Sequence, residues 1–331
     1  MFSVLIATYN HAQYICEALD SVSAQSFSDY EIVVVDDGSA DGTSTVVSHW
    51  IRNFAGRNAQ RIVLLRIENR GQSAALEHGI GSCTGRYICL LDSDDRWLPT
   101  KLEAVRQIAL EQPNLVMICH PVIIVGPTGE PTGKIRPSRA KLSRGDLRAR
   151  VRQTGRSVAA VTSGVVIRED VLRGLLPFPT KSFRFGADGY ITTGASLRGP
   201  VGIVDEPLAL YRVHPDGQYF TRMLSEDGPR LAMELHRTIA RHLGIEQNLH
   251  RSSYFTRHAF AECKLHGSRG EQLRAYANLL RATIGDDAFT LPARLTLSAF
   301  WTASLMAPRP LFLSLWRSFQ MRHMGLAGKQ S

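Results

Sequence analysis

Four short apolar runs in the first hundred residues constrain the fold most strongly. They are residues 2–7, 31–35, 62–67 and 87–91. Apolar residues recur at helical spacing in the stretches between them, at 12–25, 43–54 and 73–80. Continuous apolar runs that alternate with helices are typical of a parallel sheet covered on both faces. Right-handed crossovers place the ends of such strands on one edge, the usual ligand crevice of open α/β sheets.

Acidic residues follow two of these runs and therefore belong to the predicted edge. They are Asp36, Asp37, Asp92, Asp94 and Asp95. Asp92 and Asp94 are two positions apart, so in an extended turn both can offer oxygens to one divalent cation. Mn²⁺ or Mg²⁺ there would offset the repulsion between the carboxylates and attract a diphosphate. Taken alone, such a pair is more often a solvated loop, and Asp36 with Asp37 fits an Asx-type turn.

The rest of the chain continues the α/β pattern and then becomes helical. We expect a strand over 117–125, a basic segment over 134–156, a buried strand within 158–170, a helix beginning near Asp188, two short strands within 201–217, and helices from about residue 222. Asp188 would then lie in a first helical turn, where the helix dipole favours a carboxylate.

The net charge of +9 raises the question of a nucleic-acid partner. Much of the excess lies in the 134–156 segment and in the C-terminal third. Single-stranded nucleic acid normally requires interleaved aromatic residues, which the 134–156 segment lacks. We therefore expect no nucleic acid. The segment suits an anionic substrate such as a lipid phosphate, or an anionic membrane.

The five cysteines are scattered without metal-ligand spacing, which indicates reduced thiols and a reducing compartment. The first residues do not form a signal peptide, and no apolar run reaches the length of a transmembrane helix. We expect a cytoplasmic protein, with peripheral contact at the inner face of the membrane as a further option. The segment "LTLSAFWTASLMAPRPLFLSLWRSFQMRH" either lies on a membrane surface or packs on the core or on a second subunit.

The motifs in combination are more specific than any one of them. "SVLIATYN", "EIVVVDDGSADGT" and "ENRGQSAALEHGIGSCTGRYICLLDSDDRWLPTKLE", then "TSGVVIRED", "ADGY" and "DEPLALYRVH", keep their order and spacing. This arrangement resembles the family 2 glycosyltransferases, which have the GT-A fold: a Rossmann-like, mostly parallel sheet flanked by helices. The resemblance implies a catalytic, nucleotide-sugar-binding domain over 1–220. The helical region over 221–331 would then serve acceptor, membrane-surface or oligomer contacts.

The resemblance also implies roles for single residues. The nucleotide would contact Ala7, Thr8, Tyr9, Asp37, Asp92 and Ser93. Asp37 would accept a hydrogen bond from a uracil-like base, and the metal ligands would be Asp94 and His214. Asp95 and Arg212 would meet the donor sugar or the phosphates. Asp188 would be the catalytic base, although Ala187 stands where the family often has a second acid.

The implied activity is inverting, metal-dependent transfer of a hexose from a UDP-sugar to an acceptor hydroxyl, in cell-surface glycan or polysaccharide synthesis. The acceptor would be a glycan or a lipid-linked sugar. A nucleotidyltransferase would usually carry a Gly-rich, basic loop after its first strand, and "ATYNHAQY" has none. A sugar-nucleotide-binding protein without turnover remains an alternative because of Ala187.

Overall fold

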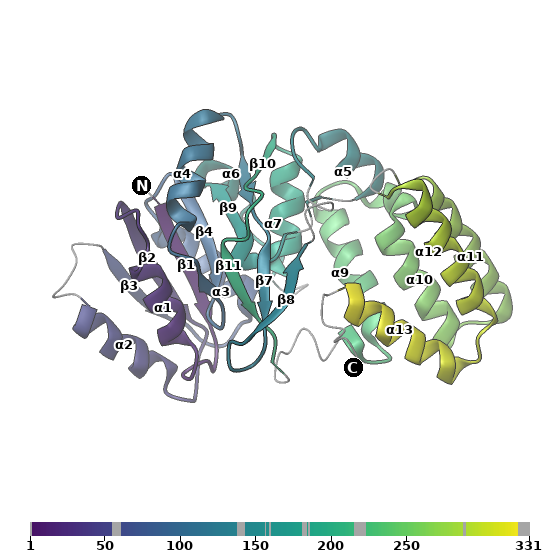
Figure 1. Ribbon diagram of the computed structural model, residues 1–331, viewed down its shortest axis with the longest axis horizontal. Coiled ribbons are helices and arrows are strands. Elements are labelled where there is room, and N and C mark those ends of the chain that lie inside the picture. Colours follow the sequence, from purple (N-terminus) through teal and green to yellow (C-terminus); the bar gives the residue numbers. More distant parts are fainter. Residues whose placement is uncertain are drawn as a thin grey trace. The chain divides into compact units, whose positions relative to one another are not determined.

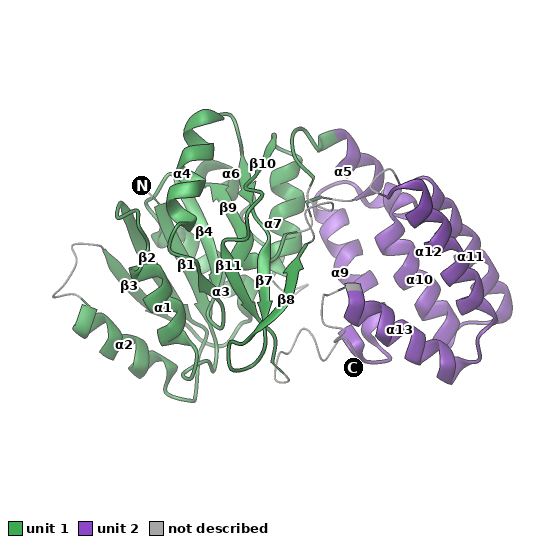
Figure 2. Ribbon diagram, in the orientation of Figure 1, with its two compact units in different colours: residues 1–148, 157–214 green, residues 149–156, 215–331 purple. Residues whose placement is uncertain are grey.

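The computed structural model shows two compact units, drawn in different colours in Figure 2. The first comprises residues 1–148 and 157–214, and the second comprises 149–156 and 215–331. The structure describes residues 2–54, 61–137, 143–155, 157–158, 160–180, 184, 186–214, 223–286 and 289–323.

A seven-stranded sheet forms the centre of the first unit (Figure 1). Its strands are β1 (Phe2–Thr8), β2 (Tyr30–Asp36), β3 (Ile62–Arg66), β4 (Tyr87–Asp92), β6 (Met117–Cys119), β9 (Val165–Arg168) and β10 (Val201–Ile203). The order is β10-β6-β9-β4-β1-β2-β3. β9 runs antiparallel to β4 and β6, and the other neighbouring pairs are parallel. The predicted α/β class with a mostly parallel sheet is confirmed.

The strand register aligns the ends from which the predicted site residues come. Thr8 pairs with Asp36 of β2, and Ala7 pairs with Asp92 of β4. The loops after β1, β2 and β4 therefore leave the sheet at one edge, as the sequence predicted.

A smaller sheet extends this edge, in the order β5-β11-β7-β8. Its strands are β5 (Arg96–Trp97), β7 (Val122–Val125), β8 (Pro131–Arg136) and β11 (Ala209–Arg212). The single strand predicted over 117–125 is wrong, because β6 and β7 belong to different sheets. The break falls at His120 and Pro121. The His120 N–H bonds to the carbonyl of Gly164, and Pro121 has no N–H to continue a ladder.

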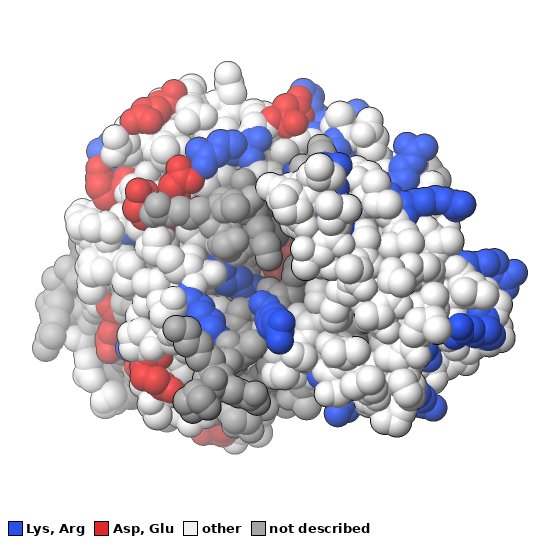
Figure 3. Space-filling model, turned by 45° about the vertical axis from the view of Figure 1, so that its right-hand side comes forward, with Lys and Arg blue, Asp and Glu red and all other residues white. Residues whose placement is uncertain are grey.

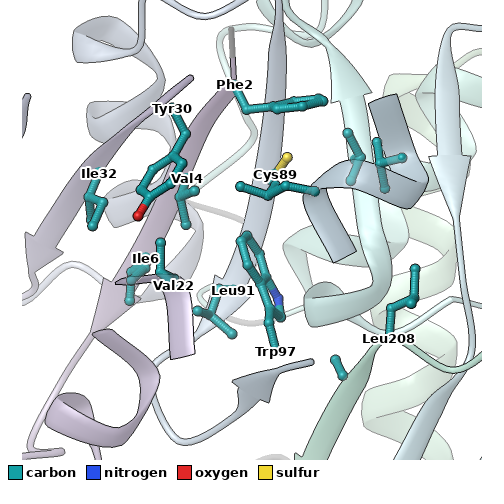
Figure 4. Packing of buried hydrophobic residues seen from close by; sticks show 14 of the residues in the cluster. Phe2, Val4, Ile6, Val22, Tyr30, Ile32, Cys89, Leu91, Trp97 and Leu208 are labelled. Carbon is teal, nitrogen blue, oxygen red and sulfur yellow. The ribbon is translucent and has the colours of Figure 1, made fainter. Parts of the chain in front are cut away.

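Helices cover both faces of the large sheet. They are α1 (Ile15–Ser23), α2 (Thr43–Phe54), α3 (Gln72–Ser82), α4 (Lys101–Glu111), α6 (Glu169–Arg173) and α7 (Ala187–Ser196), with a 3₁₀ turn, η2 (Thr162–Gly164), before β9. α1 buries Ile15, Ala18, Leu19 and Val22, the apolar stripe expected of an amphipathic helix. Figure 4 shows Val22 with residues of β1, β2 and β4 in one apolar cluster that also takes in Trp97.

The second unit is helical, as predicted from about residue 222. It contains α9 (Gly228–His242), η3 (Glu246–Arg251), α10 (Ser253–His266), α11 (Arg269–Ile284), α12 (Leu291–Met306) and α13 (Arg309–His323); α5 (Arg148–Thr154) joins it through residues 149–154. Trp301 and Trp316 are buried in its core with Phe260 and Phe312. The two tryptophans therefore pack inside the unit, and membrane contact stays a prediction. Among the described residues, none of the helices combines the length and apolar character needed to span a bilayer.

Candidate active site

The acidic loop after β4 is fastened from two sides. Asp95 is buried, and its carboxylate accepts hydrogen bonds from Ser163 Oγ at 2.6 Å and from the Arg212 N–H at 2.8 Å. Ser163 Oγ also accepts the N–H of Asp92 at 3.1 Å. η2 and β11 thus hold both ends of the loop and leave Asp94 between them.

Asp94 meets two histidines from other loops. Its Oδ2 lies 3.0 Å from His214 Nε2, and one atom each of His11, Asp94 and His214 come within 4.8 Å of one another. Burial alone would raise the pKa of Asp94. The hydrogen bond with His214 and the charges of His11 and His214 hold that pKa below its ordinary value.

This group fits a divalent cation. Carboxylate and imidazole are common ligands of divalent metals. One carboxylate and two imidazoles can each offer a ligand atom within 4.8 Å of the others, which suits a single ion. Two predicted ligands, Asp94 and His214, are therefore brought together with a third residue, His11, which the sequence did not single out.

Asp92 and Asp188 form the other half of the site. Burial, and then the neighbouring carboxylates of Asp94 and Asp188, raise the pKa of Asp92 to about 8. Its Oδ1 accepts a 3.0 Å bond from the side chain of Gln72. Burial likewise raises the pKa of Asp188, opposed by the Gly189 N–H and the charge of Arg136. Neighbouring carboxyl groups that shift one another's pKa values in this way are typical of functional sites.

Asp188 occupies the predicted helix start. α7 begins at Ala187, after Gly186 in the left-handed conformation. Glycine suits this conformation because it has no Cβ. Oδ1 of Asp188 accepts the Gly189 N–H at 2.8 Å, within the first turn. The carboxylate is therefore fixed at the N-terminal end of a ten-residue helix.

Arg212 is engaged by the protein itself. Its guanidinium donates to the carbonyls of Asp94 and Pro127 at 2.9 and 2.7 Å, and to Glu17 at 2.6 Å. Only 2% of its side chain is exposed. These contacts make Arg212 a support of the acidic loop, and its predicted phosphate contact stays a prediction.

The residues predicted for the nucleotide lie at the ends of β1, β2 and β4. The Tyr9 side chain is exposed, whereas Thr8 Oγ1 is buried without a partner. Asp37 accepts the N–H groups of Arg70 and Gly71, both at 2.8 Å. Asp37 therefore shapes the loop before α3, and its contact with a base stays a prediction.

Sequence reasoning missed several residues that organise the site. His11 is a single histidine in a loop, and Ser163 is far from the acidic motif in the sequence. Lys101 has the sequence pattern of an ordinary polar residue on a helix surface. Lys101 is fully buried, and its Nζ donates to the Ser163 carbonyl at 2.8 Å and lies 3.6 Å from the Trp97 ring centroid.

Comparison with known proteins settles the family. The family model described as "Glycosyl transferase family 2" matches residues 3–175. The chain belongs to this family. An uncharacterized glycosyltransferase of Nostoc sp. is 33% identical over 213 residues, which are 64% of this chain and 64% of that protein. The chain thus spans less than two thirds of the Nostoc relative's length. The uncharacterized glycosyltransferase YibD of Escherichia coli is 30% identical over 139 residues, covering 40% of this chain and 39% of YibD.

Solved structures confirm the predicted GT-A fold for this family member. Staphylococcus aureus TarS 1–349 superimposes with a TM-score of 0.58 at 20% identity, covering 98% of this chain and 91% of TarS 1–349. TarS has also been solved with UDP-GlcNAc. The mannosyltransferase PcManGT of Pyrobaculum calidifontis, solved with GDP-Man and Mn²⁺, has a TM-score of 0.54 at 20% identity and covers 98% of this chain and 86% of PcManGT. At these identities the likeness shows the fold alone.

Proposed function

We propose that this family member transfers a sugar from a nucleoside-diphosphate sugar, preferably a UDP-sugar, to an acceptor hydroxyl with inversion of the anomeric centre. The proposal rests on two features of one site. Asp94 and two histidines could together hold a cation, and the charge of a further carboxylate, Asp188, acts on the neighbouring Asp92. Support also comes from TarS and PcManGT, which share the fold and were solved with UDP-GlcNAc and GDP-Man.

Asp94 and His214 would hold the divalent cation. When bound, Mn²⁺ or Mg²⁺ stabilises the negative charge of the departing diphosphate. Asp92 and Ser93 would contact the ribose side of the donor, and Asp95 would keep the loop in place. Tyr9, the most exposed of these side chains, would lie against the base, with Ala7, Thr8 and Asp37 at the neighbouring strand ends.

Asp188 would act as the general base. Its raised pKa brings it closer to neutral pH than an ordinary aspartate, which favours proton transfer. The acceptor oxygen attacks the anomeric carbon, a new C–O bond forms, and the bond to the β-phosphate oxygen breaks. The hydroxyl proton goes to Asp188, and the nucleoside diphosphate leaves. One displacement inverts the configuration, by the same stereochemical logic as in inverting glycosidases.

The basic segment would recognise an anionic acceptor such as a lipid-pyrophosphate-linked sugar. Arg136 at the end of β8 acts on Asp188 through its charge and lies 5.7 Å from the Tyr211 ring centroid. Arg144 and Arg148 are paired with Asp205 and Asp146. Three further basic residues of this segment (Arg139, Lys141 and Arg156) lie outside the described residues. The excess of positive charge over the whole chain is visible in Figure 3, where Lys and Arg without visible Asp or Glu mark the right-hand part of the face shown.

The decisive experiment is incubation with a panel of UDP-sugars and GDP-mannose in the presence of Mn²⁺, with release of the nucleoside diphosphate as the readout. Release that depends on Asp94 and Asp188 supports the proposal. Tight nucleotide binding without release on any acceptor would instead support the binding-protein alternative. The anomeric configuration of an isolated product, determined by NMR, tests inversion separately.

A further inference from the structure

His11 lies at the cation-binding group although it belongs to a separate loop. His11 follows β1, Asp94 follows β4 and His214 follows β11, and the potential ligand atoms all lie within 4.8 Å of one another. Two ligand atoms of one ion are separated by at most about twice a metal–ligand bond, roughly 4–5 Å. The three side chains are therefore spaced for a single ion.

The His11 ring is held in place by the middle residue of the acidic motif. Its Nδ1 lies 2.7 Å from Ser93 Oγ. A hydrogen bond at one imidazole nitrogen fixes the ring and leaves the other nitrogen for a metal, which is how ligating histidines are usually oriented. Ser93 is itself buried, so its hydroxyl is held in a fixed position by the surrounding protein.

The loop that carries His11 is also fixed. The His11 N–H bonds to Thr43 Oγ1 at 3.0 Å, and the Ala12 N–H bonds to Asp41 at 2.9 Å. Just before them, Asn10 adopts the left-handed conformation, and its side chain accepts the N–H of Ala40 at 2.9 Å. These contacts tie the loop to the start of α2 and present the ring without further rearrangement.

His214 lies beside both His11 and Asp94. The two imidazole centroids are 6.1 Å apart, and the Tyr14 ring contacts both, at 5.7 and 5.2 Å. The 3.0 Å separation of Asp94 Oδ2 from His214 Nε2 equals the spacing of adjacent ligands on an ion with bonds of about 2.1 Å.

We propose that His11 is a third protein ligand of the divalent cation, so that the site has two imidazoles and one carboxylate and selects Mn²⁺ or Co²⁺ over Mg²⁺ and Ca²⁺. The inference rests on the proposed function and deepens it. Mg²⁺ and Ca²⁺ take oxygen ligands, whereas imidazole suits the first-row transition metals. A site with Asp94 alone would discriminate far less between these ions.

The test counts nitrogen ligands directly. Pulsed EPR of the Mn²⁺–UDP complex should show two imidazole nitrogens in the wild type, one in His11→Ala and one in His214→Ala. Calorimetry with UDP present should show a preference for Mn²⁺ over Mg²⁺ that falls roughly tenfold or more in His11→Ala. Ser93→Ala, which removes the hydroxyl that contacts His11 Nδ1, should keep both nitrogens. His49→Ala, an exposed histidine of α2, is the matched control.

A wild-type spectrum with only one imidazole would overturn the inference even if His11→Ala failed to fold. An unchanged metal preference in a folded His11→Ala would do the same. In both cases the proposed function would stand if the wild type binds UDP in a Mn²⁺-dependent way and Asp94→Asn does not. If the wild type binds no Mn²⁺ with UDP, the inference and the metal-dependent proposal both fail.

Discussion

Ser163 Oγ donates a 2.6 Å hydrogen bond to Oδ2 of Asp95 and thereby fastens the acidic loop to the turn before β9. The same hydroxyl accepts the Asp92 N–H. One side chain therefore fixes both ends of the Asp92–Asp95 segment, and the position of Asp94 depends on a residue that takes no part in metal binding. This arrangement makes the loop sensitive to a change that leaves every acidic residue in place.

Ser163→Ala should remove both contacts and leave buried polar groups short of a partner. We expect a loss of about 1–3 kcal/mol in the free energy of unfolding, together with weaker Mn²⁺-assisted UDP binding. Urea denaturation and UDP titration measure the two effects. Ser23→Ala, whose hydroxyl bonds only within α1, is the control. UDP affinity equal to that of the wild type would show that Ser163 does not position the loop.

Asp188→Asn should lower transfer by at least about 10²-fold, because an amide cannot take the acceptor proton. The carboxamide oxygen can still accept the Gly189 N–H, so the start of α7 should stay intact. UDP affinity with Mn²⁺ should change little, whereas Asp94→Ala should lose both binding and transfer. Initial rates on a competent donor–acceptor pair provide the measurement. Near-native turnover of Asp188→Asn would reject this residue as the base.

The main strands and the helix start at Asp188 could be predicted from the sequence because each depends on local pattern. Apolar runs define β1 to β4, and the crossover rule aligns their ends. The break between β6 and β7 was missed because the apolar run continues through His120 and Pro121 with little interruption. The break depends on the Gly164 carbonyl, which binds the His120 N–H and comes from a distant part of the chain.

The site could be predicted only where a motif carries it. Asp94 and His214 were found through the resemblance, and the structure brings them together. His11 and Ser163 were not found, because a lone loop histidine and a serine before a buried strand have no pattern of their own. Their importance comes from contacts across 82 and 68 residues of sequence. Periodicity and spacing do not encode such contacts.

Asp37→Ala should weaken UDP binding without altering the metal requirement. The carboxylate holds the N–H groups of Arg70 and Gly71, so its loss would disturb the loop before α3 in addition to removing the proposed base contact. Titration of UDP at several Mn²⁺ concentrations separates affinity from metal dependence. Asp37→Asn keeps one acceptor and should show a smaller loss. Equal UDP affinities of the alanine variant and the wild type would reject both roles of Asp37.

Arg136→Ala should raise KM for an anionic acceptor while leaving KM for the donor nearly unchanged. The positive charge of Arg136 also lowers the pKa of Asp188. Its removal should therefore shift the acidic limb of the pH–rate profile to higher pH, because the base must lose its proton to act. Arg106→Ala, whose guanidinium is paired with Glu103 within α4 and lies outside the basic segment, is the control. An equal rise in KM for charged and uncharged acceptors would contradict a role in anion recognition.

Lys101→Met should change how stability depends on pH. Burial lowers the pKa of Lys101 to about 7, whereas an unfolded lysine has a pKa of about 10.4. Between these values Lys101 binds more protons in the unfolded chain than in the folded one, so its contribution to the free energy of unfolding rises with pH, by up to about 1.4 kcal/mol per unit. Below pH 7 the lysine is protonated in both states and contributes no slope. The raised pKa values of Cys89 and Cys119, about 12, and of Asp92, about 8, give slopes of the opposite sign in this window, and all the proteins compared share them. Urea denaturation at pH 7, 8 and 9 should therefore show that the free energy of unfolding of the wild type and of Lys134→Met rises with pH relative to that of Lys101→Met. Parallel pH profiles for all three proteins would show that burial does not lower the pKa of Lys101 in the folded protein.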